Sequence, residues 1–357
     1  MEFLEEMMIA PEKEEAEHPL ENRGRPPELK SYIMESNDGL PKTDQVSPLK
    51  VAVSPTNLKE VSILRLFQEG NHSVFYMDAT DPRFLILYTN DLADKTDKLF
   101  DRLVLSAANR LDKIYVPTET LGRISDSHGN VFEGFGLRFS DSFALEELEK
   151  PIQQLRMSVT GSNSREALEA LHSRKKLARA LAYSRTLVRR GTRQSFVADD
   201  IRYTGRIITR SGNSIDDHVS LLEIIRKNYR NLVEEVERNR IGTRTIENRT
   251  LLEGQAFDLN LERQIENLDG FVDSLLNSTG KFRLWGLKSE ASRDVRRVVA
   301  VDLHTGDPID LEIASSLVRI YLPKEACGNT VLRLYVNLQH TFDSEIRLND
   351  EKLATVG

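Results

Sequence analysis

The clearest pattern in the sequence is a pair of helical seams within residues 213–280. In the first seam the apolar residues are three or four positions apart, at Leu222, Ile225, Tyr229, Leu232 and Val236. The second seam repeats this spacing at Leu261, Ile265, Leu268, Val272 and Leu275. Gly242 and Gly280 stand where the two helices should end. The pattern predicts a helical hairpin, and we expect the chain to self-associate through these seams.

The C-terminal segment, residues 281–357, changes to an alternation of apolar and polar positions. This period of two predicts strands at Phe282–Leu287, Val298–His304, Ile309–Ile313, Leu317–Leu322 and Val331–Leu338. Most of the connections between these runs are short. We therefore expect an antiparallel sheet in this segment.

The N-terminal part divides into two segments. Residues 1–50 contain 6 basic and 12 acidic residues and half of the 12 prolines, a composition typical of an acidic, mostly disordered tail. Residues 51–160 mix helical spacing, after Asn57 and over Ala93–Leu111, with strand-like runs such as Phe84–Tyr88. This order predicts a small mixed α+β domain.

The central segment, residues 161–212, is rich in arginine. Residues 151–212 carry 13 basic and 4 acidic residues, a local charge of +9 in a chain whose net charge is −7. Ser164 is a suitable cap for a helix that would run to about Arg190, and alternation from Phe196 to Ile208 then predicts one strand. The expected fold is thus α+β: a small N-terminal mixed domain, a central basic helix and helical hairpin, and a C-terminal antiparallel β-sheet.

The basic segment is the first candidate site, and its chemistry suits nucleic-acid phosphates. Rows of cations are what phosphate contact requires, and arginine can contact a phosphate through two hydrogen bonds. The candidate residues are Lys175, Arg179, Arg185, Arg189, Arg190, Arg202, Arg206 and Arg210. The same surface would also fit an acidic protein partner or subunit, or be a merely solvated face. The acidic tail is a further internal counter-charge that would mask it.

A predicted hairpin near the C-terminus is the second candidate site. A three-residue loop around Gly306 would place Asp302 opposite Asp310, with His304 and Glu312 on the same face. Like charges in this position are unfavourable unless a cation lies between them, and these residue types are suitable metal ligands. This pattern supports the alternative of a metal-dependent hydrolase, possibly a nuclease, with a divalent metal as its cofactor.

The remaining features limit the classes of function. The sequence contains no P-loop, no G-x-G-x-x-G, no H-E-x-x-H and no G-x-S-x-G motif. It has one cysteine, Cys327, and neither a long apolar run nor a signal-peptide pattern, so we expect a cytoplasmic chain with no membrane contact. The leading hypothesis is a non-catalytic nucleic-acid-binding or assembly component. The alternatives are the hydrolase and a scaffold subunit that docks an acidic protein.

Overall fold

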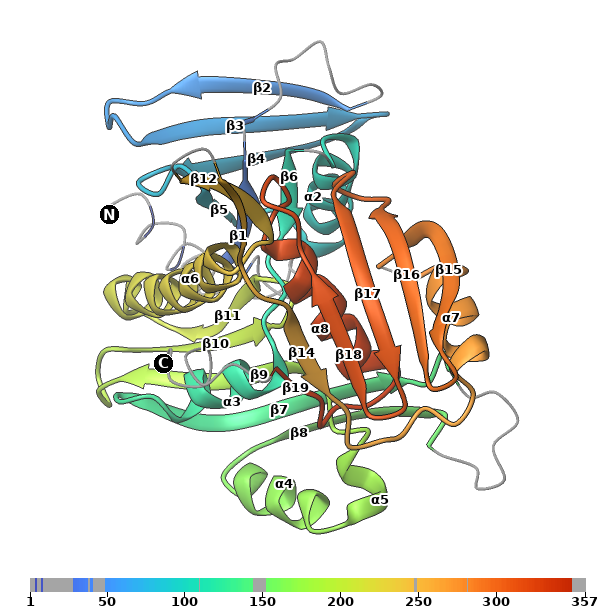
Figure 1. Ribbon diagram of the computed structural model, residues 1–357. Helices are drawn as coiled ribbons and strands as arrows, with labels where there is room; N and C mark the ends of the chain where they lie inside the picture. Colours follow the sequence, from blue (N-terminus) through green and yellow to red (C-terminus); the bar gives the residue numbers. More distant parts are fainter. Residues whose placement is uncertain are drawn as a thin grey trace. The chain divides into compact units, whose positions relative to one another are not determined.

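The computed structural model describes residues 4, 8, 28–37, 39–40, 49–108, 110–143, 152–246, 249–280 and 282–348. These residues form seven helices and nineteen strands, and neighbouring strands pair antiparallel (Figure 1). The chain divides into two compact units, which are described separately. Unit 1 comprises residues 1–114, 124–133 and 185–226, and unit 2 comprises residues 115–123, 134–184 and 227–357.

Unit 1 is built on a sheet whose strand order is β2-β3-β4-β5-β1-β11-β10-β9, with β6 paired to the end of β1. Its strands are β1 (Lys30–Ser36), β2 (Lys50–Pro55), β3 (Val61–Gln68), β4 (Asn71–Asp78), β5 (Phe84–Thr89), β6 (Leu111–Lys113), β9 (Tyr183–Gly191), β10 (Phe196–Arg202) and β11 (Arg206–Gly212). Strand β1 is buried along its whole length, because it has a strand on each side. Helix α2 (Ala93–Ser106) covers one face, where Phe100 packs on Tyr32, and the first half of α6 (Ile215–Arg238) covers the other.

Unit 2 contains a six-stranded sheet with strand order β15-β16-β17-β18-β14-β19, the two-stranded sheet β12-β13, and the paired strands β7 and β8. The strands are β7 (Asn130–Ser140), β8 (Gln154–Thr160), β12 (Gly242–Ile246), β13 (Arg249–Glu253), β14 (Phe257–Asn260), β15 (Leu284–Ser292), β16 (Val295–Asp302), β17 (Pro308–Ala314), β18 (Leu317–Tyr321) and β19 (Arg347–Leu348). The helices are α3 (Thr118–Asp126), α4 (Ser164–His172), α5 (Lys175–Ala178), α7 (Leu268–Leu276) and α8 (Asn329–Thr341). Helix α8 is almost wholly buried, and Arg333 reaches from it to Asp302 of β16. No helix in the described ranges is long and apolar enough to span a bilayer.

The predicted α+β fold with a central helical hairpin is wrong. The first seam is indeed a helix, α6, but its apolar residues are buried within the chain rather than available to a second copy. In the second seam Leu261 and Ile265 are not helical: their N–H groups donate to the carbonyls of Ser316 and Ser315, at 3.0 and 2.7 Å. Only α7 remains helical, because β12, β13 and β14 occupy the chain before it.

The basic segment also folds differently from the expectation of one helix and one strand. After the short helices α4 and α5 the chain enters β9, where the β-branched Thr186 and Val188 are buried two positions apart. The expected single strand from Phe196 to Ile208 is a hairpin of β10 and β11. Gly205 makes the turn possible, since its φ of +74° is readily adopted only by glycine.

Three further expectations are corrected at other positions. Lys30–Ser36, within the predicted acidic tail, is the central strand β1; most of the rest of that tail lies outside the described residues. The helix expected after Asn57 is replaced by β3, and the last expected strand, Val331–Leu338, is part of α8. The other four C-terminal strands are present as β15 to β18.

Candidate functional site

Four arginines of unit 1 gather on one face of the sheet, the face that α2 also covers. We call Arg185, Arg202, Arg206 and Arg210 the guanidinium cluster. Arg202 of β10 lies opposite Arg185 of β9, and Arg206 of β11 lies opposite Tyr32 of β1. The turn brings Arg202 and Arg206 together, because the Gly205 N–H donates to the Arg202 carbonyl at 3.0 Å. Arg202 and Arg206, which the sequence placed along one strand, are therefore neighbours on the two strands of a hairpin.

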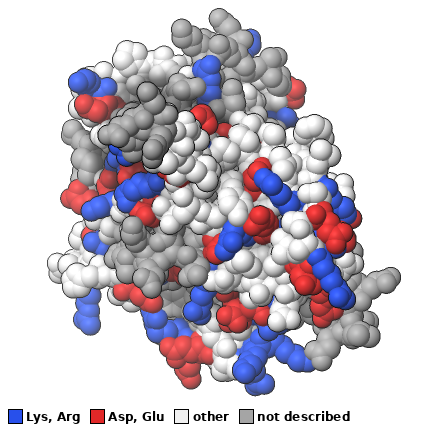
Figure 2. Space-filling view, in the orientation of Figure 1, with Lys and Arg blue, Asp and Glu red and all other residues white. Residues whose placement is uncertain are grey.

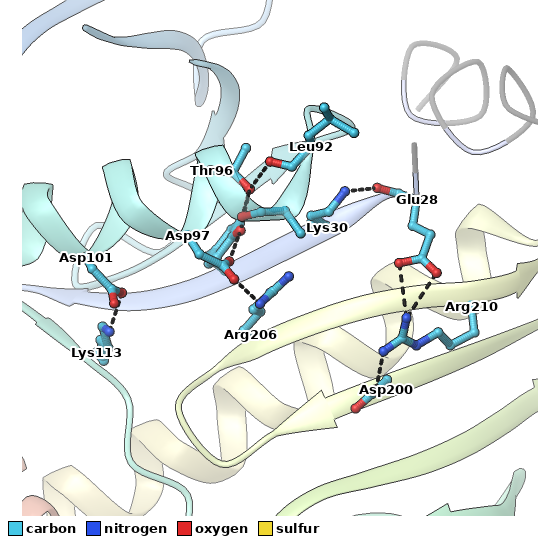
Figure 3. Close-up of polar contacts among 12 residues, drawn as sticks. Glu28, Lys30, Leu92, Thr96, Asp97, Asp101, Lys113, Asp200, Arg206 and Arg210 are labelled. Carbon is cyan, nitrogen blue, oxygen red and sulfur yellow. Dashed lines mark hydrogen bonds and ion pairs between the residues drawn. The ribbon is translucent and has the colours of Figure 1, made fainter. Parts of the chain in front are cut away.

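A β-bulge adds the fourth arginine to this face. Asp199 pairs with Thr209 and Ala198 pairs with Ser211, so Arg210 is an additional residue in β11. Bulges of this kind redirect side chains out of the regular alternation. The Arg210 guanidinium points to Asp200, at 2.7 Å, and to the Glu28 carboxylate, at 3.0 Å (Figure 3).

Acidic side chains position three of the four guanidinium groups. Arg206 pairs with Asp97 of α2, and both Arg185 and Arg210 pair with the fully buried Asp200. Hydrogen bonds between guanidinium and carboxylate are directional, so these pairs hold the arginines in fixed orientations. The side chains of Arg185 and Arg210 stay 25% and 28% exposed, which leaves part of each accessible to solvent.

Arg202 is the exception in the guanidinium cluster. Among the described residues no carboxylate or carbonyl accepts a hydrogen bond from it, and its Nε is buried without a partner. Burial lowers the pKa of Arg202, and the neighbouring charges of Arg206 and Arg210 lower it further. The charges of Asp200 and Asp97 offset part of this effect, but neither carboxylate is hydrogen-bonded to Arg202. A half-buried guanidinium without a hydrogen-bond acceptor costs free energy, which a bound anion would recover.

Lys30 adds a fifth cation beside the guanidinium cluster. Its side chain is 2% exposed, and its Nζ donates to the Glu28 carbonyl at 2.6 Å (Figure 3). Burial lowers the pKa of Lys30 to about 8, and the charge of Arg206 acts in the same direction. The acids whose charges act on these five cations are Glu28, Asp91, Asp97 and Asp200, so the cations exceed the acids by one.

The other four predicted phosphate-binding residues lie elsewhere. Arg189 lies over the ring of Phe196, at 4.0 Å, and Arg190 bonds to Asn130 and the His128 carbonyl on a neighbouring turn. Lys175 and Arg179 are exposed residues of unit 2. On the face that Figure 2 shows, blue and red side chains alternate rather than forming a continuous basic surface. The eight predicted residues therefore do not form one site.

The predicted carboxylate hairpin does not assemble as expected. The connection between β16 and β17 is five residues long, so Asp310 lies opposite Val299 rather than opposite Asp302. Asp302 is buried in an ion pair with Arg333 and also accepts the N–H of His304, at 2.8 Å. Asp310 pairs with Arg297, and Glu312 accepts the hydroxyl of Tyr321 at 2.8 Å. No group of three or more metal-binding side chains is present in the part of the chain that the structure describes.

A buried relay of Ser31, His218 and Asp199 joins β1, α6 and β10 in unit 1. The Ser31 Oγ lies 2.8 Å from His218 Nε2, and His218 Nδ1 lies 2.8 Å from Asp199 Oδ2. Because a carboxylate only accepts, Nδ1 carries a proton, and in a neutral ring Nε2 accepts from the serine. Thr209 donates to the other Asp199 oxygen at 2.8 Å. The sequence offered no signal for this relay, since Ser31 and His218 are 187 positions apart.

The relay has the order of a catalytic triad but lacks the surroundings of one. All three side chains are 0% exposed, and Ser31 is in the middle of a central strand, between Tyr88 and Ile207. Triad nucleophiles need an accessible oxygen and donors for an oxyanion. We therefore assign the relay to fixing the first turn of α6 on the sheet.

Unit 2 contains a cavity of about 530 Å³. Its walls are mainly apolar and include Leu232, Leu332 and Ile346. The carboxylate of Glu119 is occupied, because the Tyr335 hydroxyl and the Gln339 amide donate to its two oxygens at 2.8 and 2.9 Å. Burial and this carboxylate raise the pKa of Tyr335 well above its usual range. The cavity offers less defined polar chemistry than the guanidinium cluster.

Comparison with known proteins adds one family. The model of the MJECL33-like protein family matches residues 2–355. A relative from Methanocaldococcus jannaschii, described as uncharacterized protein MJECL33, is 30% identical over 364 residues. The match covers 91% of this chain and 86% of the relative.

Proposed function

The chain belongs to the MJECL33-like protein family, and we propose that it is a non-catalytic component that binds nucleic-acid phosphates at the guanidinium cluster of unit 1. One observation carries the proposal: no described carboxylate accepts a hydrogen bond from Arg202, although it is half-buried beside Arg206 and Arg210. A phosphate oxygen would give Arg202 the acceptor that it lacks and balance the excess of cations.

The arrangement of the cluster favours a phosphate chain over a single anion. Its arginines come from three adjacent strands, and neighbouring strands are about 4.8 Å apart, so the cations form a row across the sheet. The acids Asp97 and Asp200 orient this row in advance, which reduces the entropy that binding would cost. The residues of the predicted metal-dependent hydrolase do not form one site, because Asp302, Asp310 and Glu312 bond to Arg333, Arg297 and Tyr321 respectively.

The direct test is binding of labelled single- and double-stranded DNA and RNA by the full chain over a salt series. Arg202→Gln should weaken binding about tenfold or more, since a hydrogen bond to a charged group is worth about 1.5–3 kcal/mol. The slope of log affinity against log salt should fall by about 0.7–0.9, which is the loss of one phosphate contact. The variant should be at least as stable as the wild type, because Arg202 has no ion pair to lose.

Arg193→Gln is the matched control, because Arg193 is exposed in the turn between β9 and β10 and outside the cluster. It should leave affinity nearly unchanged. Absence of binding to all four nucleic acids by the wild type at low salt would refute the proposal. Equal competition by poly-glutamate would instead indicate an acidic protein partner, and full competition by inorganic phosphate would indicate a small phosphate ligand.

Binding should also weaken as the pH rises through the pKa of Lys30. Below about pH 8 the buried ammonium is protonated and attracts phosphate; above it the amine is neutral and that attraction is lost. Lys30→Met should bind more weakly than the wild type near neutral pH, and the two should converge by about pH 9–10. Titrations of both proteins at several pH values would check this. A constant ratio of their affinities across this range would contradict a role for Lys30 in binding.

A further inference from the structure

The outer face of the unit 2 sheet carries apolar side chains at one edge. Trp285 and Leu287 of β15 are 71% and 79% exposed, and Val299 of β16 is 51% exposed. Leu287 lies directly opposite Val299, so these side chains are adjacent on one face. The opposite face carries buried residues such as Leu284 and Val298. Exposure of neighbouring large apolar side chains on a folded sheet marks an interaction surface.

The main chain at this edge is also available for pairing. Strand β15 is the first in the sheet order, and within the described residues its only strand partner is β16. It is nine residues long and contains no proline. An edge strand of this length presents unpaired N–H and C=O groups that can template a further strand.

We propose that β15 pairs antiparallel with β15 of a second copy of this chain, about a twofold axis at Ser289. The charges of β15 favour a second copy and this register, in addition to the pairs that Lys288 forms with Asp273 and Glu290 with Arg296 across from it. Lys288 and Glu290 flank Ser289, so a twofold axis there places each lysine opposite the glutamate of the other copy. An axis at Lys288 would instead oppose two lysines, which is unfavourable across a strand pair.

The same pairing covers side chains that β16 leaves open. Trp285, Leu287 and Ser289 each have a neighbour on β16 but none on the other flank among the described residues. With the axis at Ser289, the strand of the second copy runs beside Trp285 and Leu287 and covers the flank that β16 leaves open.

The first test uses a cysteine at the axis. Residues on a twofold axis of an antiparallel pair face their own copies at about 4.5–5.5 Å between Cα atoms, which is within the range of a disulfide. Under mild oxidation Ser289→Cys should form a covalent dimer. Ser195→Cys, in an exposed turn of unit 1, is the control, and both variants retain Cys327. Equal crosslinking of the two variants would overturn the proposed pairing.

The second test uses charge reversal. Lys288→Glu should raise the dimer dissociation constant about tenfold or more in sedimentation experiments, because it opposes two glutamates at both pairs. Adding Glu290→Lys should restore association. Both the single and the double variant lose the contact of Lys288 with Asp273 of α7. Restored dimer formation in the double variant therefore cannot come from that contact. Failure of the double variant to recover would overturn the register.

The third test uses the fluorescence of Trp285, the only tryptophan in the chain. As protein concentration rises, its emission should shift to shorter wavelength and acrylamide should quench it less. The shift should follow the dimer fraction from sedimentation and be absent in Lys288→Glu. A wild-type chain that remains monomeric, with emission independent of concentration, would exclude a second copy as the partner.

Discussion

Replacing Asp302 by asparagine should lower the free energy of unfolding by about 3–5 kcal/mol. Asp302 and Arg333 form an ion pair whose side chains are 0% and 1% exposed. The substitution retains the shape of the side chain but removes the negative charge that pairs with the buried Arg333 guanidinium. The expected loss is therefore that of an uncompensated charge, and denaturant titration with an unchanged m-value would measure it.

Asp310→Asn is the matched control for this prediction. Asp310 pairs with Arg297 at 3.3 Å, but the two side chains are 31% and 53% exposed, so water screens the pair. Its loss should cost less than about 1 kcal/mol. If Asp302→Asn does not fold, adding Arg333→Met should restore folding, because it removes the unpaired charge as well. Equal stability of wild type and Asp302→Asn would contradict the buried pair.

Replacing His218 by alanine should cost about 3–5 kcal/mol of unfolding free energy. The change leaves the buried Asp199 carboxylate without the imidazole, leaves the Ser31 hydroxyl without an acceptor, and creates a cavity. Ser31→Ala should cost only about 1–2 kcal/mol, because it removes one neutral group. The order of the two effects, measured by denaturant titration, is the test of a structural relay.

His128→Ala is the control for His218→Ala, because the side chain of His128 is exposed; its effect should be near zero. The wild type should also resist labelling by a fluorophosphonate, since Ser31 is 0% exposed. Specific labelling that disappears in Ser31→Ala would show that the relay is accessible and reactive. That outcome would replace its structural assignment with a catalytic one.

The sequence predicted that the candidate site would be rich in arginine, but not which arginines and which acids would meet there. The excess of arginine in residues 151–212 is visible in the sequence, and four of the eight predicted residues do lie together. The turn at Gly205 and the bulge at Arg210 determine which four residues meet. Neither feature disturbs the alternation of apolar and polar residues enough to be recognised in the sequence. The partners Asp97 and Glu28 come from elements more than 100 positions away in the chain. The sequence shows where the cationic residues are in the chain, but only the fold determines which acidic residues pair with them.

The sequence by itself determined the elements whose period is supported by many consecutive residues. Helix α6 and strands β16 to β18 are of this kind, because their buried faces repeat every 3.6 or every two residues. Strand β1 was decided only by the tertiary structure, since its buried Lys30, Ser31 and Glu35 read as a polar segment until their partners are in place. Local spacing sets which face of an element is apolar, whereas burial of a polar group depends on acceptors and charges that arrive from distant segments.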